Sequence, residues 1–183
     1  RLNTLDLSFN LIREIKGLDQ LVELEDLNLY DNKIDEITGL DKLSKLKCLN
    51  LGKLSENSKI EEIKGLEKLN KLEDLNLCKN KIGNIINLKY NLKLKNLNLS
   101  KNENISIEGI KELTHLEALD LGYTNRKELG EEIQLLTNLK ELYLRSNEKI
   151  SIEGIKNLTN LEVLDLGYTN RKELGEIKNL DNL

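Results

Sequence analysis

The chain has 183 residues, of which 33% are charged and 38% are hydrophobic, and this length is enough for one sizeable domain with a large hydrated surface. Its net charge of −4 gives no electrostatic reason to expect a nucleic acid or an anionic membrane as a partner. No run of about 18 apolar residues is present to span a bilayer, and the absence of proline means that Gly, Asn and Asp must make the turns.

Leucines recur in the pattern L-x-x-L-x-L, which begins at residues 2, 24, 46, 72, 94, 116, 139 and 161. Intervals of 22 to 26 residues with this pattern are typical of a leucine-rich repeat array, in which each repeat contacts only its neighbours. We therefore predict a single domain over 1–183 with eight repeats, at 2–23, 24–45, 46–71, 72–93, 94–115, 116–138, 139–160 and 161–182.

Both ends of the array are expected to be uncapped. Arg1 directly precedes a strand leucine, and Leu183 has the place of the first leucine of a ninth repeat. A solenoid normally covers its terminal core with a polar cap. We therefore expect this chain to be a piece of a longer protein.

Each repeat is predicted to begin with a short strand, because alternate residues of L-x-L point to opposite faces. In "LEDLNLYDN", Leu27 and Leu29 are expected to point inward, and Asp26, Asn28 and Tyr30 outward. The predicted strand centres are Leu5–Leu7, Leu27–Leu29, Leu49–Leu51, Leu75–Leu77, Leu97–Leu99, Leu119–Leu121, Leu142–Leu144 and Leu164–Leu166.

The remainder of each repeat returns the chain to the next strand. Asn at the end of the strand is expected to bond backbone groups of the adjacent turn (Asn10, Asn32, Asn80, Asn102 and Asn147), with Thr124 and Thr169 as partial replacements. Tight turns are expected at Gly17, Gly39, Gly65, Gly109 and Gly154. A repeat of this length leaves room only for short 3₁₀ or single-turn helices. The predicted fold class is a right-handed α/β solenoid with a parallel sheet on its concave face.

The segment "LDLSFNLIREIKGLDQLVELEDLNLYDNKIDEITGLDKLSKLKCLNL" at 5–51 resembles the leucine-rich repeats of the protein phosphatase 1 regulatory subunit, and "LTNLKELYL" and "LTNLEVLDL" are similar to both that family and the listerial internalins. The resemblance implies that the residue inside each L-x-L contacts a protein partner. Those positions are Asp6, Asn28, Asn50, Asn76, Asn98, Asp120, Tyr143 and Asp165.

The stretch "LDLGYTNRKELGE" occurs at 119–131 and again at 164–176, which indicates a duplicated pair of repeats. It places Tyr and Arg, the residue types that dominate interface energetics, among carboxylates on the concave face. The predicted partner-binding residues are Asp120, Tyr123, Glu141, Tyr143, Arg145, Asp165 and Tyr168, together with Asp26, Asn28 and Tyr30. The alternative is that Arg145 only balances Asp120 and Asp165. The outward carboxylates predict a basic partner surface and association that weakens with salt.

Catalytic and metal-binding chemistry is not indicated. His115 stands alone among charged residues, and the Asp120/Asp165 pair has Tyr143 between its members on an open surface. Cys48 and Cys78 are expected on adjacent strands but roughly 13 Å apart at about 3.3 Å per residue, which is too far for a disulfide. They are expected to be free thiols that react readily with a labelling reagent. The "NRK" at 125–127 and 170–172 is interpreted as a solvated edge, and the insertion at 52–60 as a loop.

The predicted function is that of a non-enzymatic scaffold without cofactor or metal, which binds a protein partner on its concave face inside the cell, in the cytoplasm or nucleus. A protein phosphatase catalytic subunit is one candidate partner by resemblance, and neither nucleic acid nor membrane is expected as a partner. Two alternatives stay open: a segment of an internalin-like surface adhesin, or the recognition module of a larger enzyme.

Overall fold

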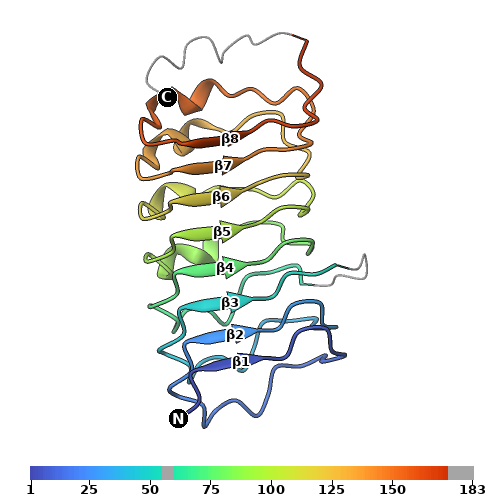
Figure 1. Cartoon of the computed structure of the whole chain (residues 1–183), viewed down its shortest axis with the longest axis vertical. Coiled ribbons are helices and arrows are strands. Elements are labelled where there is room, and N and C mark those ends of the chain that lie inside the picture. Colours follow the sequence, from blue (N-terminus) through green and yellow to red (C-terminus); the bar gives the residue numbers. More distant parts are fainter. Residues whose placement is uncertain (55–59, 173–183) are drawn as a thin grey trace.

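Parallel strands, one per repeat, form a single open sheet in the computed structural model, which describes residues 1–54 and 60–172 (Figure 1). Residues 55–59 of the insertion, and the last repeat beyond residue 172, lie outside this description. The sheet is eight-stranded, and its order follows the chain: β1 (Thr4–Asp6), β2 (Asp26–Asn28), β3 (Cys48–Asn50), β4 (Asp74–Asn76), β5 (Asn96–Asn98), β6 (Ala118–Asp120), β7 (Glu141–Tyr143) and β8 (Val163–Asp165).

The register aligns equivalent leucines of successive repeats, so that Leu5 pairs with Leu27 and Leu27 with Leu49. Each strand begins and ends one residue before its predicted centre. β1, for example, covers Thr4–Asp6, where Leu5–Leu7 was predicted. In every strand except β7, which ends at Tyr143, the cause is the Asn or Asp at the strand end, whose side chain accepts a hydrogen bond from the backbone two residues later and starts a turn. In β2, for example, Tyr30 N–H donates to Asn28 Oδ1 at 3.1 Å.

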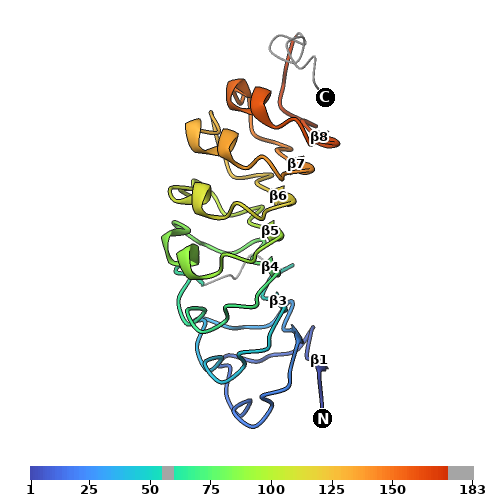
Figure 2. The ribbon, with the colours of Figure 1, turned by 90° about the vertical axis from the view of Figure 1, so that its left-hand side faces the viewer.

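Short 3₁₀ helices lie on the side opposite the sheet: η1 (Ile86–Tyr90), η2 (Ile110–Glu112), η3 (Glu131–Leu135) and η4 (Glu153–Asn157). Figure 2 shows the strands along the inner curve of the solenoid and these helices along the outer one. This confirms the predicted fold class. Within residues 1–54 and 60–172, no helix is long and apolar enough to cross a membrane.

The outer turns use left-handed backbone at Gly17, Gly39, Gly65 and Gly109, as predicted, with φ between 69° and 86°. Gly154 was wrongly assigned to this set, because it lies inside η4 and has no positive φ. The glycine with positive φ in the preceding repeat is Gly130, at 75°.

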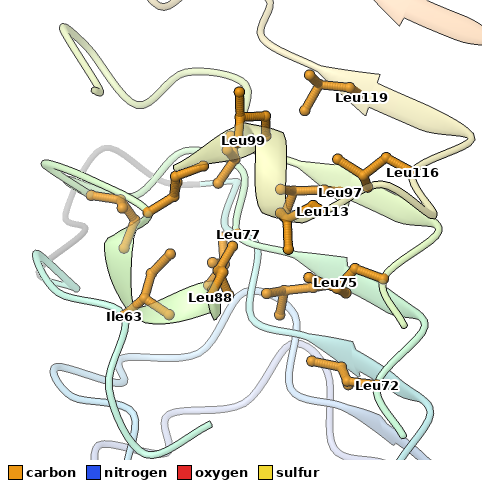
Figure 3. Packing of buried hydrophobic residues seen from close by; sticks show 14 of the residues in the cluster. Ile63, Leu72, Leu75, Leu77, Leu88, Leu97, Leu99, Leu113, Leu116 and Leu119 are labelled. Atoms are coloured by element: carbon orange, nitrogen blue, oxygen red, sulfur yellow. The ribbon is translucent and has the colours of Figure 1, made fainter. Parts of the chain in front are cut away.

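The core is a continuous column of leucine and isoleucine between the sheet and the outer turns. Leu72, Leu75 and Leu77 supply one layer and Leu116 and Leu119 a later one, all at most 2% exposed (Figure 3). Because each layer packs on the next, burial of one repeat depends on its neighbours.

Buried asparagines join the repeats, as predicted. Asn102 Nδ2 donates to the carbonyls of Leu77 and Leu99, both at 2.9 Å, and its Oδ1 accepts from Ile82 N–H at 2.9 Å. Thr124 keeps only part of this pattern, since its Oγ1 donates to Leu121 O at 2.7 Å. The Asn102 amide thus bonds backbone groups of two repeats at once.

Cationic side chains replace backbone donors where a repeat carries extra residues. In the regular second repeat, Lys33 N–H donates to Ile12 O of the first repeat at 2.8 Å. In the third repeat the buried Lys53 donates from Nζ to Ile34 O at 3.0 Å, and in the sixth Arg126 donates from Nη1 to Ile105 O at 2.7 Å. The interpretation of "NRK" as a solvated edge was therefore wrong for Arg126, whose burial also lowers the pKa of its guanidinium.

Candidate functional site

The middle row of the concave face has a structural role that the resemblance did not indicate. Seven of its eight positions carry Asn or Asp, and in each the side-chain Oδ1 accepts a hydrogen bond from the backbone N–H two residues later, at 2.8–3.1 Å. We call these residues the Asx row: Asp6, Asn28, Asn50, Asn76, Asn98, Asp120 and Asp165. Tyr143 is the eighth residue of the series. The expected partner contacts at the other seven positions thus compete with turn formation.

A hollow of about 360 Å³ lies over the central strands, between Asp26 on β2 and Tyr143 on β7. All of its charged lining residues are carboxylates, namely Asp26, Asp74 and Asp120. Asp74 accepts hydrogen bonds from Asn96 Nδ2 and from the Cys48 thiol. Burial raises the pKa of Asp120, and the charge of Asp165 adds to this effect. The hollow therefore presents acceptors and negative charge.

The predicted residues of the duplicated region are brought together on β6–β8 and the turns that follow these strands. Arg145 donates from Nε to Asp165 Oδ2 at 3.1 Å, and its guanidinium carbon lies 5.4 Å from the centre of the Tyr168 ring. Of the two carboxylates expected around Arg145, Asp165 makes this ion pair. Tyr143 donates its hydroxyl to Glu141 Oε2 at 2.7 Å, and this hydrogen bond raises the pKa of Tyr143.

Asp26, Asn28 and Tyr30 form a separate group at the other end of the sheet. β2 lies four strand spacings from β6, which is about 19 Å. Tyr30 packs edge-on against Phe9, with ring centres 5.4 Å apart, and Phe9 is 66% exposed. Phe9 was not among the predicted residues, although "LDLSFN" places it at the same point of its repeat as Tyr123 and Tyr168.

Alternating charges flank the concave face at the residue before each strand from β2 to β8. Lys47 bonds Glu25 at 2.6 Å, Lys95 bonds Glu73 at 2.7 Å, and Lys140 bonds Glu117 at 2.6 Å. These hydrogen bonds lower the pKa of Glu73 and Glu117 and raise that of Lys47, Lys95 and Lys140. Because each of these lysines offsets one glutamate, the three pairs add no net charge, and most of the negative charge of the face belongs to the strand positions themselves.

Both cysteines are free, as predicted, but neither is fully accessible. Burial, followed by the charge of Asp74, raises the pKa of the Cys48 thiol to about 11, and burial also raises the pKa of Cys78. Cys78 Sγ leans over Gly52, so that a Cβ at residue 52 would lie 2.8 Å from it. The expectation of ready labelling therefore needs revision.

Native Cys48 is expected to react slowly at pH 7 and faster as pH rises. A thiol with a pKa of about 11 has a thiolate fraction roughly 10²–10³ times smaller than an ordinary cysteine at that pH, so its rate should rise about tenfold per pH unit until it approaches the pKa. Iodoacetamide labelling between pH 7 and pH 10, quantified by mass spectrometry, measures this. Equal rates for native and urea-unfolded protein at pH 7 would contradict it.

Within the described ranges, no group of three or more His, Cys, Asp or Glu side chains is placed to hold a metal ion. His115 is exposed and lies outside the sheet, in the turn before β6. What the concave face offers is a broad polar surface with aromatic residues at both ends.

Comparisons with known proteins agree with this architecture. The family model described as Leucine-rich repeat region matches residues 76–183, and the one described as Leucine Rich repeats (2 copies) matches residues 1–42. No curated protein sequence matches the chain. Internalin C2 from Listeria monocytogenes is similar in structure, with a TM-score of 0.84 and 25% identity over 98% of this chain and 77% of its own.

Two further structures from Listeria monocytogenes are similar in fold. Internalin InlF gives a TM-score of 0.71 at 21% identity, covering all of this chain and 59% of its own. The functional domain of InlJ gives 0.62 at 17% identity, and the chain spans 47% of it.

Proposed function

Because this chain belongs to the leucine-rich repeat family, we propose that it is a non-enzymatic scaffold whose concave face docks a basic segment of a protein partner. Leucine-rich repeat arrays generally use their extended concave surface for protein–protein interaction. The observation that carries the proposal is the central hollow, whose charged lining residues Asp26, Asp74 and Asp120 are all carboxylates. A lysine- or arginine-rich segment matches that charge.

Within this face, the contact hot spot is placed at Tyr143 and Arg145. Tyr143 is the residue of the middle row that departs from the Asx pattern, and Arg145 is half-exposed, with 47% of its side chain accessible. Large aromatic and arginine side chains at the centre of an interface commonly carry most of its binding energy. The remaining predicted residues then form the surroundings of this hot spot.

Selection of peptides from a random display library against the immobilised chain tests the proposal. Enriched peptides should carry several Lys or Arg residues, and their affinity should fall as NaCl is raised. The double variant Asp26→Asn, Asp74→Asn should bind them about tenfold more weakly, as expected for removal of two complementary charges. Tyr143→Ala and Arg145→Ala should each cost about tenfold as well.

The control is Glu61→Gln with Glu62→Gln, which makes the same change of charge at two exposed residues that lie outside the sheet and line a separate acidic hollow. Those substitutions should leave affinity within about twofold, since neither residue lines the central hollow and salt screens exposed charges that do not contact the ligand. Peptides whose affinity falls with the Glu61/Glu62 variant and not with the Asp26/Asp74 variant would contradict the proposal.

A phosphatase catalytic subunit is one partner of this kind, proposed from the resemblance at 5–51. Direct binding of a purified phosphatase 1 catalytic subunit, measured with the same variants, tests it. With this partner, we also propose that the chain acts inside the cell, in the cytoplasm or nucleus.

A second candidate function is recognition at a cell surface, as an internalin-like adhesin. The similarity to internalin C2 over 98% of the chain favours it. The genomic reading frame around this sequence separates the two: a flanking secretion signal and anchor support the adhesin, and an adjoining enzyme domain supports a recognition module instead.

A further inference from the structure

Two exposed tyrosines occupy equivalent positions in the duplicated repeats. Tyr123 and Tyr168 each follow a "LDLG" stretch, and each has left-handed backbone, with φ of 58° and 56°. Their side chains are 44% and 76% exposed, so neither contributes to the core. The same turn position is left-handed in other repeats, where it carries Phe9, Asp31, Lys79, Lys101 and Ser146. This backbone therefore does not require an aromatic side chain, and folding gives no reason for a tyrosine at either place.

Each ring is held by a cation from the preceding repeat. Lys101 Nζ lies 5.2 Å from the centre of the Tyr123 ring, and the Arg145 guanidinium carbon lies 5.4 Å from that of Tyr168. Arg145 is itself fixed by its ion pair with Asp165 at 3.1 Å. Such contacts restrict the rings before any partner arrives, which lowers the entropic cost of binding.

The backbone spacing expected between the two positions is close to one turn of a polyproline II helix. They lie two strands apart in a regular parallel sheet, with β7 between them, and two strand spacings are about 9.4–9.8 Å. One turn of a polyproline II helix rises about 9.3 Å over three residues. The corresponding repeats of other conformations fit less well: about 6.7 Å for two residues of a β-strand, and about 5.4 or 10.8 Å for one or two turns of an α-helix.

Donors and charge between and beside the rings suit the same ligand. Arg145 and Ser146 lie in the repeat between the two tyrosines, and a guanidinium has more N–H donors than its bond to Asp165 uses. Carbonyl groups of a polyproline II segment make no internal hydrogen bonds and are free to accept. Three carboxylates near the rings, Asp120, Glu141 and Asp165, outnumber the two cations that contact the rings, Lys101 and Arg145. The excess negative charge complements Lys or Arg in the ligand.

We propose that Tyr123, Arg145 and Tyr168 form a docking site for a basic proline-rich segment of the partner, with prolines three positions apart stacked on the two rings. The segment crosses the turns that follow β6, β7 and β8, and one proline sits on each tyrosine. This proposal rests on the proposed function, in which the concave face binds a basic protein segment, and it specifies the conformation and sequence spacing of that segment.

Fluorescence polarisation with two fluorescein-labelled ten-residue peptides tests the site. The first peptide carries arginine at both ends and two prolines three positions apart; the second has the same composition with the prolines two positions apart. The first should bind at least about tenfold more tightly, because only its prolines match both rings. Tyr123→Ala and Tyr168→Ala should each weaken its binding by about tenfold, as expected for loss of an aromatic anchor, and Tyr123→Phe should retain it.

Tyr90→Ala is the matched control. Tyr90 lies in η1 on the convex side, is 49% exposed, and has Lys89 Nζ at 5.1 Å from its ring centre. This substitution should leave peptide affinity within about twofold, and thermal denaturation should show that all variants fold, since these side chains are exposed. Equal affinity for the two peptides, no binding of the first, or insensitivity to Tyr123→Ala and Tyr168→Ala would overturn the proposal. If library-selected basic peptides still require Asp26 and Asp74, this inference fails alone; if they do not, the proposed function fails as well.

Discussion

Replacing Gly65 with alanine is expected to lower the free energy of unfolding by about 3–4 kcal/mol, through backbone strain and steric overlap together. Gly65 turns the chain on the convex side with φ of 73°. A Cβ added there would lie 2.5 Å from the carbonyl oxygen of Ile37 in the preceding repeat. Because that oxygen belongs to the backbone of a packed turn, the two repeats would have to separate to make room.

Gly109→Ala is the control for the strain alone. Gly109 has a similar φ of 86° and also lies in an interior repeat, but a Cβ there would meet no atom within 4 Å. Its substitution should cost only the left-handed penalty of about 1–2 kcal/mol. Urea denaturation followed by circular dichroism measures both variants. Equal losses would show that the close approach to Ile37 is not what requires glycine at residue 65.

The pair also shows how far the sequence alone could lead. Glycine in "IKGLEKL" and "IEGIKEL" predicts the same turn in both repeats, and the backbone angles confirm this. The sequence could not indicate that Gly65 approaches a neighbouring carbonyl and Gly109 does not, because this distance depends on how successive repeats stack. Local periodicity specifies the elements, and the superhelical stacking specifies which of them touch.

The concave face shows the same division between local and tertiary information. Which side chains point outward follows from the alternation in L-x-L, and Leu27 and Leu29 are buried as that alternation predicts. The hydrogen bond from Gly122 N–H to Asp120 Oδ1, by contrast, needs the turn geometry that the structure supplies. An Asn or Asp two residues before a turn was the available signal, but the leucine pattern and the family resemblance assigned those residues to partner contacts instead.

Residues that depart from the repeat pattern were the least predictable. Lys53 carries a charge and is only 3% exposed, and no sequence pattern indicates that its amino group reaches Ile34 O. Asn91 replaces an outer leucine; its Nδ2 donates to Leu66 O and Leu69 O, while its buried Oδ1 has no hydrogen-bond partner within the described residues. Such substitutions act on neighbouring repeats, so a single repeat read in isolation does not show their role.

Replacing Asn147 with alanine is expected to cost about 3–4 kcal/mol of unfolding free energy, since it removes four hydrogen bonds worth about 1 kcal/mol each. Asn147 Nδ2 donates to Leu121 O at 2.8 Å and Leu144 O at 2.9 Å. Its Oδ1 accepts from Arg126 N–H at 2.8 Å and from Thr124 Oγ1 at 3.2 Å. Alanine would leave groups of two repeats buried without a partner, and the array would lose its cohesion at that interface.

Two further substitutions test whether the loss comes from the hydrogen bonds that Asn147 makes between repeats. Asn147→Thr should cost roughly half as much as alanine, because Thr124 already shows that a threonine here bonds the carbonyl three residues earlier, at 2.7 Å. Asn10→Ala should cost about 0.5 kcal/mol or less, since exposed groups exchange their bonds for water and Asn10 donates to Leu7 O and Ser8 O at the exposed end of the sheet. The urea midpoint is therefore expected to be lowest for Asn147→Ala, intermediate for Asn147→Thr and highest for Asn10→Ala. If Asn10→Ala costs as much as Asn147→Ala, the amides act within their own turns, and the bond to the preceding repeat is not what holds neighbouring repeats together.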